Sequence, residues 1–357
     1  MKGKPMKTIK RIITLITALA VMASMAVTAV QASPGNPEFM LAIGDSITTG
    51  YGLEDYMEGE SPYLCSSYAN MVANALGLKG GESYINKAVN GATSTDLLKL
   101  LPDLEKFLGY SEFIVVTIGG NDLLGAVPLV ASAISGKNIT SLGSAIDILS
   151  AATPEDFAAL ANHAGFQRQI SGVLTKYATN LAAIAEIIKK NAPDAHVLFL
   201  KQYNPMKNVL GFGDFGNFAD TLIDNINATM QTVCTTYGFD IADAPSVINV
   251  NAVGLTNMLN YDIHPNAAGH VELAKLVASH LGISLDPSEN TFEEVTTEAP
   301  ETEPETEPAT DTLPEQTEAE ATEPAEDKKG CGSAISCASI LLSAACAFVI
   351  VKKKTEV

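Results

Sequence analysis

The chain has 357 residues and a net charge of −19, with 22 Lys and Arg against 41 Asp and Glu. Fourteen of the acidic residues lie between positions 291 and 327, where there is no Lys or Arg, so only five of the nineteen net negative charges belong to the rest of the chain. This distribution excludes a basic nucleic-acid-binding surface, and we expect no nucleic-acid partner. Because the acidity belongs to one segment, it does not indicate the charge of a substrate.

The N-terminus has the pattern of an export signal. Four lysines and Arg11 precede an uncharged apolar run over 12–30. Val30-Gln31-Ala32 then places small residues at the positions that a signal peptidase reads. We therefore expect residues 1–32 to be a cleaved signal peptide, with an uncleaved N-terminal anchor as the alternative.

Residues 36–287 form a stretch of roughly 250 residues, which is long enough for one domain with a substantial core. We expect strands at 39–43, 83–88, 113–118, 197–201 and 239–242. We expect helices near 63–76, 94–108, 166–190, 217–237 and 265–281, with Pro265 in the first turn of the last one. Short, almost uniformly apolar strands that alternate with helices predict an α/β fold with a parallel five-stranded sheet covered on both faces.

Two segments of this domain allow two interpretations each. Residues 125–165 are rich in Ala and Ser and predict a helical insertion above the sheet edge, either as a cover over the site or as a solvent-facing excursion without a role. Residues 211–218 alternate Gly with Phe. They predict a loop that either lines an apolar acyl or aryl pocket or packs its phenylalanines on the core.

The segments after the domain indicate display at a membrane. Residues 291–327 are rich in Thr, Glu, Pro and Ala, a composition that predicts a disordered, extended linker. Residues 333–351 are nineteen uncharged residues, close to the ~20 needed for a transmembrane helix. Three lysines follow, so we expect 352–357 to be cytoplasmic and the domain to lie on the extracellular face of a Gram-positive type membrane.

Cysteine usage predicts no metal site. Three of the five cysteines lie in or beside the last apolar segment, and only Cys65 and Cys234 lie in the domain. These two either pair in an oxidising exterior or remain buried free thiols. No cysteine group has the spacing of a zinc site, so we expect no structural metal.

Ser46 is the candidate nucleophile. It ends Gly44-Asp45-Ser46, directly after the apolar strand expected at 39–43. A hydroxyl in that position lies at the carboxyl edge of the sheet, where α/β folds place their chemistry. Alone, such a triplet is only moderately specific, because Gly and Ser also form ordinary turns.

His264 is the candidate base. The other four histidines lie within or beside helical or strand patterns, whereas His264 lies in a polar loop before a helix with Asp262 two residues away. An imidazole there can take the serine proton and return it to a leaving group.

The remaining requirement of acyl transfer is a set of amide donors for the developing oxyanion. Asn121 follows the strand expected at 113–118 and presents a side-chain NH₂, while Gly91 follows the strand at 83–88 and offers a backbone N–H. Either residue alone is better explained as part of a turn. Four such elements in chain order favour a catalytic site.

Together these segments resemble the four blocks of the SGNH/GDSL hydrolase family: Gly44-Asp45-Ser46, Gly91, Gly119-Gly120-Asn121-Asp122 and Asp262-Ile263-His264-Pro265. The resemblance covers most of residues 38–285. It implies a flavodoxin-like three-layer α/β/α fold and the hydrolysis of carboxylic esters without a cofactor. Members of this family act on lipids, thioesters, aryl esters and acetylated sugars.

The resemblance also implies the role of each residue. Ser46 is the nucleophile, His264 the base, and the N–H groups of Ser46 and Gly91 form the oxyanion hole with Asn121. The family usually has its acid three residues before the histidine, where this chain has Tyr261. We expect Asp262 to be the acid; the alternative is that Asp262 caps the following helix and that a backbone carbonyl orients the ring of a Ser–His dyad.

The sequence therefore predicts an exported, membrane-tethered serine ester hydrolase that forms an acyl-enzyme. A carbohydrate acetylesterase and a lipase or lysophospholipase fit equally well. The alternative is a non-catalytic glycan-binding or adhesion module on the same fold, which the shifted acid suggests.

Overall fold

A computed structural model of the chain describes residues 36–210 and 212–286. The segments predicted as signal peptide, linker, membrane anchor and cytoplasmic tail lie outside these described residues. Within the described ranges, no helix has the length and apolar character needed to cross a membrane.

The core of the fold is one parallel sheet. Its strands are β1 (Met40–Gly44), β2 (Tyr84–Asn86), β3 (Phe113–Thr117), β4 (His196–Leu200) and β5 (Asp240–Ala242). They lie in the order β2-β1-β3-β4-β5, and every neighbouring pair is parallel. The predicted five-stranded parallel sheet is thus confirmed. β2 is shorter than expected because the side-chain oxygen of Asn86 accepts the N–H of Ala88, which turns the chain.

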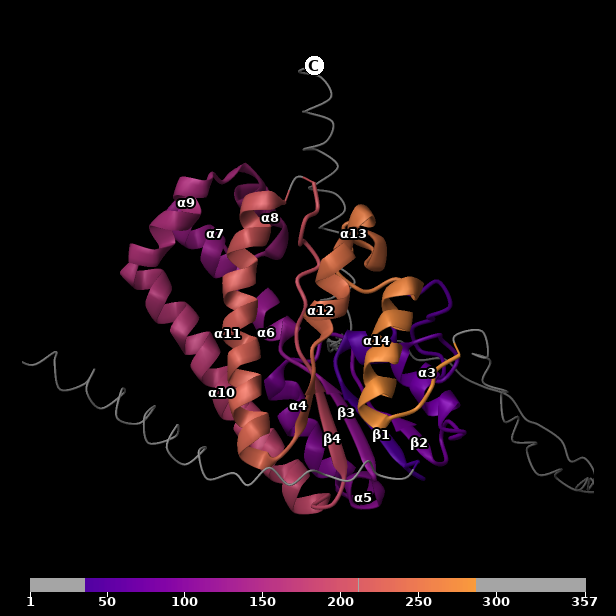
Figure 1. The fold of residues 1–357 in the computed structure, drawn as a ribbon. Helices are drawn as coiled ribbons and strands as arrows, with labels where there is room; N and C mark the ends of the chain where they lie inside the picture. Colours follow the sequence, from indigo (N-terminus) through magenta and orange to yellow (C-terminus); the bar gives the residue numbers. More distant parts are fainter. Residues whose placement is uncertain (1–35, 211, 287–357) are drawn as a thin grey trace, which may run out of the picture.

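Helices cover both faces of the sheet, as Figure 1 shows. One layer contains α4 (Ser94–Leu100), α5 (Glu105–Tyr110), α10 (Ala164–Asn191) and α11 (Gly213–Tyr237), and the other contains α3 (Tyr68–Ala75), α12 (Ala244–Ile248) and α14 (Ala267–Leu281). Successive residues of a strand point to opposite faces. Leu41 and Ile43 accordingly join the first core, while Met40 and Ala42 join the second. The three-layer α/β/α architecture follows from strands that are apolar on both sides.

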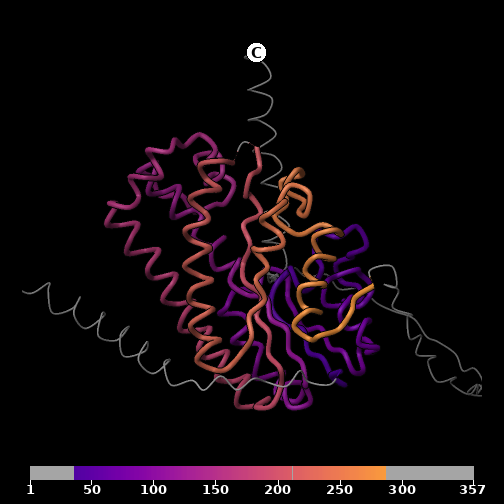
Figure 2. The backbone as a smooth tube through the Cα atoms, viewed as in Figure 1, coloured from indigo at the N-terminus to yellow at the C-terminus, as the bar shows by residue number. Residues whose placement is uncertain are grey.

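The start and the end of the described chain lie side by side, as the indigo and orange parts of the tube in Figure 2 show. The backbone N–H of Tyr68 in α3 donates to Nδ1 of His270 in α14 at 3.1 Å. The two rings stack with their planes 9° apart. This contact holds α14 beside α3.

Helix boundaries differ from the predicted ones where a capping side chain decides them. α3 begins at Tyr68 rather than near 63, because Ser67 accepts the N–H of Asn70. α14 begins at Ala267 and is capped by Asn266. The expectation that Pro265 lies in its first turn is wrong, because Pro265 precedes the cap and pairs with Thr256 in an isolated bridge.

Two further predicted segments are corrected. The helix expected over 94–108 is divided by a 3₁₀ turn, Leu101–Leu104, that contains Pro102, since proline lacks the N–H of a regular helix. The segment 211–218, predicted to be a loop, is largely helical because α11 begins at Gly213.

Residues 125–165 form the predicted helical insertion. It contains α7 (Val127–Ser135), α8 (Leu142–Ala151) and α9 (Pro154–Ala159), which lie beside the start of α11 in Figure 1. Its buried apolar residues pack on Phe215, Phe218 and Leu222 of α11. The insertion is therefore not a free excursion in solvent, because it supports one end of α11.

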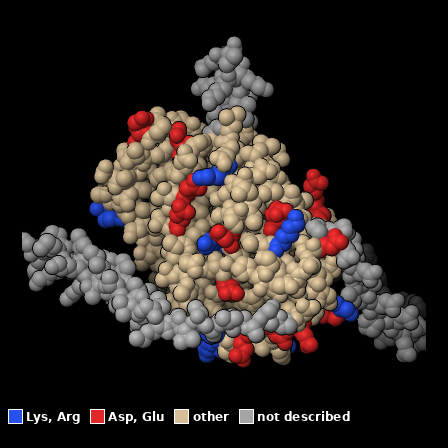
Figure 3. Space-filling model, in the orientation of Figure 1, with Lys and Arg blue, Asp and Glu red and all other residues tan. Residues whose placement is uncertain are grey.

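The surface visible in Figure 3 has no large region of one charge, and the two cysteines of the domain form no disulfide. On the face in Figure 3, acidic and basic side chains are interspersed rather than separated by sign. Of the two alternatives for Cys65 and Cys234, the structure has the buried free thiols.

Candidate active site

Ser46 lies where β1 gives way to a short helix, α2 (Ser46–Thr49). Gly44, with φ of 126°, lets β1 pass so close to β3 that a Cβ would lie 1.9 Å from the carbonyl oxygen of Thr117. Only glycine fits there. Asp45 then caps α2 by accepting the N–H of Ile47 at 3.2 Å. The hydroxyl of Ser46 is thereby placed at the carboxyl end of the sheet.

The structure brings Ser46 and His264 into contact across 218 residues. Nε2 of His264 lies 2.9 Å from Oγ of Ser46. Only 4% of Ser46 and 2% of His264 are exposed to solvent. A buried imidazole within hydrogen-bond reach of a hydroxyl has the geometry of a general base.

Asp262 completes this chain of contacts. Its Oδ1 lies 2.5 Å from Nδ1 of His264 and also accepts the backbone N–H of His264 at 3.1 Å. The turn at Tyr261, where φ is 61°, directs the carboxylate toward the ring. Because Asn266 caps α14, the capping role considered for Asp262 is excluded. Burial acts to raise the pKa of Asp262, but the hydrogen bond and charge of His264 outweigh it, so the pKa is lowered and the carboxylate stays ionised.

Two residues that the sequence did not reveal hold the histidine loop in place. Nδ2 of Asn257 donates to the carbonyl of Gly52 at 2.7 Å, and its N–H donates to the carbonyl of His264 at 2.9 Å. A Cβ on Gly52 would lie 2.9 Å from Cβ of His264 and 3.1 Å from Oδ2 of Asp262. The loop after α2 and the loop before α14 are thus closely packed.

The three predicted oxyanion donors lie on segments that are hydrogen-bonded to one another. Nδ2 of Asn121, in α6 (Gly120–Leu124), donates to the carbonyl of Ala92 at 3.0 Å, next to Gly91. Its NH₂ group retains a second N–H. Asn90, on the other side of Gly91, accepts from the hydroxyl of Thr49 in α2 at 2.6 Å. The N–H of Ser46 is at the start of α2, where it has no carbonyl partner within its own helix.

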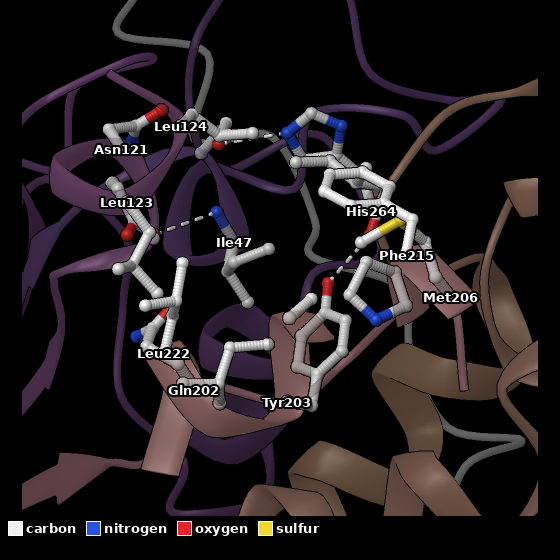
Figure 4. A pocket seen from close by; sticks show the side chains of 17 residues that line it. Ile47, Asn121, Leu123, Leu124, Gln202, Tyr203, Met206, Phe215, Leu222 and His264 are labelled. Atoms are coloured by element: carbon white, nitrogen blue, oxygen red, sulfur yellow. Dashed lines mark hydrogen bonds between the residues drawn. The ribbon is translucent and has the colours of Figure 1, made fainter. Parts of the chain in front are cut away.

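A pocket opens beside these groups (Figure 4). Ser46, Asn121 and His264 line it together with a set of apolar side chains. In Figure 4, Leu123 and Leu222 lie on one side of Ile47, and Met206 and Phe215 lie on the other. Of the residues 125–165 proposed as a cover, none is among the described residues that line this pocket.

The model of the GDSL-like lipase/acylhydrolase family matches residues 42–271 of this chain. The chain belongs to this family. Residues 42–271 include all four segments on which the resemblance was based. Membership supports the hydrolysis of ester bonds in general. No curated protein is found to match the chain.

Several solved structures are similar to this GDSL-like protein. Phospholipase A1 from Streptomyces albidoflavus NA297 is 18% identical with a TM-score of 0.48, over 68% of this chain and 99% of that one. The lipase Lip_vut3 from a goat rumen metagenome is 18% identical with a TM-score of 0.44, over 68% and 96%. Axe2, an acetylxylan esterase from Geobacillus stearothermophilus, is 17% identical with a TM-score of 0.45, over 69% and 95%.

One further member of the site was missed at the sequence level. Asp45 is 2% exposed and accepts the hydroxyl of Thr117 at 2.8 Å. Thr117 and Tyr68 both contact the hydroxyl of Thr48 at 2.7 Å, so a buried polar network extends beneath α2. Burial raises the pKa of Asp45 to about 6, although hydrogen bonds from Thr117 and Ile47 oppose the shift. An aspartate before the nucleophile signals a helix cap, but its burial cannot be read from the sequence.

Within 36–210 and 212–286, no group of three or more His, Cys, Asp or Glu side chains is placed to hold a metal ion.

Proposed function

We propose that this GDSL-like protein is a serine ester hydrolase that works through an acyl-enzyme. The supporting observation is the unbroken series of contacts from the hydroxyl of Ser46 to Nε2 of His264 and from Nδ1 to Asp262. Hydrogen-bonded nucleophile, base and orienting carboxylate are the parts that acyl transfer requires.

In the first half of the reaction, His264 takes the proton of Ser46 while Oγ attacks the ester carbonyl carbon. The negative charge that develops on the carbonyl oxygen is stabilised by the N–H groups of Ser46 and Gly91 and by the amide of Asn121. His264 then gives its proton to the departing alcohol, and the C–O bond of the ester breaks.

In the second half, a water molecule replaces the alcohol. His264 takes a proton from this water, whose oxygen attacks the acyl-enzyme carbonyl. The bond to Oγ breaks, Ser46 regains its proton from His264, and the carboxylic acid leaves. Asp262 holds the ring in position and stabilises its positive charge in both halves.

The test compares the full-length protein with Ser46→Ala, both purified in detergent, on nitrophenyl acetate. We expect the wild type to hydrolyse this ester and a fluorophosphonate probe to label Ser46. We expect Ser46→Ala to lose both properties. Undiminished hydrolysis by Ser46→Ala would remove this serine from the mechanism. A folded wild type that neither hydrolyses esters nor reacts with the probe would instead indicate a binding or adhesion module.

We further propose that the protein is exported and tethered to the outer face of the cell membrane. This proposal rests on the sequence of 1–32, 291–327, 333–351 and 352–357. A membrane-impermeant fluorophosphonate shows whether the domain lies outside or inside the cell. Labelling of Ser46 on intact cells supports display, and labelling only after lysis contradicts it.

A further inference from the structure

The walls of the pocket beside Ser46 are mostly apolar. Apart from the residues around the proposed catalytic groups, its lining comes from α6, from the chain after β4 and from α11. The apolar side chains of this lining include Leu123, Met206, Phe215, Ala219 and Leu222. Such a surface gains free energy by removing methylene groups from water.

The polar side chains of the lining at the end of β4 are already hydrogen-bonded. Nε2 of Gln202 donates to the carbonyl of Ile118 at 3.2 Å, and the hydroxyl of Tyr203 donates to the carbonyl of Ile263 at 2.9 Å. Because the α11 residues of the lining are all apolar, the hydroxyl groups of a sugar placed against them would give up their water without gaining equivalent partners, which is unfavourable. A hydrocarbon chain has no such groups to satisfy.

The α11 wall of the pocket is supported from behind by the insertion. Phe215 lines the pocket and stacks on Phe157 of α9, with ring centroids 6.1 Å apart. Phe157 also stacks on Phe218 at 5.3 Å, and Phe218 contacts Phe166 at 6.2 Å. Phe157 is 8% exposed and does not line the pocket. It contacts a wall residue and thereby restricts where that residue lies.

We propose that this pocket binds the acyl chain of an ester longer than acetate, and that Phe157 positions the wall that limits the chain. The proposal rests on the proposed function and selects a fatty-acyl ester over an acetylated glycan. It also gives the insertion 125–165 a role, because α9 shapes the pocket without covering it.

The first test keeps the leaving group constant and varies the acyl group, using nitrophenyl acetate, butyrate, octanoate and palmitate with the full-length protein. A methylene group in a hydrophobic pocket changes selectivity by roughly tenfold or more. We expect kcat/KM for octanoate to exceed that for acetate by at least about tenfold. A wild type that prefers acetate would overturn the proposal.

The second test fills the pocket. Ala219 is 8% exposed and lies one helical turn after Phe215 on the same face of α11. We expect Ala219→Leu to lower the octanoate-to-acetate ratio of kcat/KM at least about tenfold. Ala228→Leu is the matched control, because Ala228 lies on the same helix but is exposed to solvent. We expect it to preserve the ratio.

The third test concerns Phe157. We expect Phe157→Ala and Phe215→Ala to raise the palmitate-to-octanoate ratio of kcat/KM, because both loosen the same wall. We expect Phe157→Tyr, which keeps the ring, to retain the wild-type ratio. A Phe157→Ala variant that loses thermal stability but keeps the ratio shows a merely structural role and overturns this part.

The outcomes separate the two proposals. If Ala219→Leu reduces acetate and octanoate hydrolysis equally while its unfolding midpoint is unchanged, the pocket holds the leaving group and the acyl assignment is wrong. If acetate hydrolysis depends on Ser46 but no variant alters the chain-length profile, only this inference fails. If no ester is hydrolysed, the proposed function fails first.

Discussion

Asp262 reaches His264 from only two positions away, with Oδ1 2.5 Å from Nδ1 of the ring. The backbone of Tyr261 makes this possible, because its φ of 61° places it in the left-handed region, which residues other than glycine adopt uncommonly. This turn lets a carboxylate two residues before the histidine reach the ring, although the resemblance implied an acid three residues before it.

This contact predicts the behaviour of Asp262→Asn. An amide cannot hold the ring in the required tautomer, so we expect kcat on nitrophenyl acetate to fall by up to about 10⁴-fold with little change in KM. The unfolding midpoint serves as the control for folding. A loss well below tenfold, which corresponds to about 1.4 kcal/mol of barrier, would show that a backbone group orients His264 instead.

Asn121→Ala tests the oxyanion hole. Removal of one donor of this kind lowers kcat by roughly 10²- to 10³-fold, because the donor acts mainly in the transition state. We expect that loss here. Asn180→Ala is the control, since the amide of Asn180 donates to hydroxyls of Ser94 and Thr95 outside the pocket. Equal losses in both variants would argue against a role for Asn121 in the transition state.

Gly44→Ala tests the close approach of β1 and β3 at Thr117. A methyl group 1.9 Å from the carbonyl oxygen of Thr117 forces the strands apart, and we expect a protein that does not fold or unfolds at a much lower temperature. Gly136 also has a positive φ, 66°, but nothing lies within 4 Å of its Cβ position. Gly136→Ala should therefore cost only about 1–2 kcal/mol of stability. Similar midpoints for the two variants would contradict the steric explanation.

Asp45→Asn tests the buried carboxyl beneath α2. The pKa of Asp45 is raised from 3.8 to about 6 by burial, so between these values the folded protein binds more protons than the unfolded chain. The contribution to stability is greatest below pH 4 and is lost as pH rises through 6, by about 3 kcal/mol in total. We expect the wild-type stability minus that of Asp45→Asn, measured by urea unfolding, to fall over this range. A constant difference would contradict the assignment.

His270→Gln should show the opposite pH dependence. Burial first, and then the charge of His264, lower the pKa of His270 from 6.5 to about 3, so the fold keeps this ring neutral. Its contribution to stability is complete above pH 6.5 and is lost as pH falls toward 3, by up to about 5 kcal/mol. The loss of ring stacking lowers the stability of His270→Gln at every pH, but we expect a shallower decline in acid. If the stabilities of the wild type and His270→Gln decline in parallel as the pH falls, His270 is not a source of acid lability.

Much of the fold was predictable, because strands buried on both faces read as short apolar runs at regular intervals along the chain. The helix starts were less accessible. Ser67 and Asn266 decide where α3 and α14 begin, and each competes with nearby residues that could equally begin a helix.

Some residues of the site could likewise be predicted from the sequence and others could not. Ser46, Asn121 and His264 stand at element ends, so their positions could be inferred from the pattern. Asn257 and Gly52 could not, since neither stands in a recognisable motif and their contact depends on how two loops pack together. The burial of Asp45 and the packing of Phe157 on Phe215 likewise depend on which helices meet, and no local pattern contains that information.

The separation of Ser46 from His264 has a consequence for synthesis. A ribosome that has completed α2 has made the hydroxyl of Ser46, but His264 and the helix α14, which packs against α3, are still to be made. The contact between Ser46 and His264 therefore cannot form until almost the entire domain has been translated. The ester hydrolysis proposed for Ser46 and His264 thus begins only when almost the whole domain has been made.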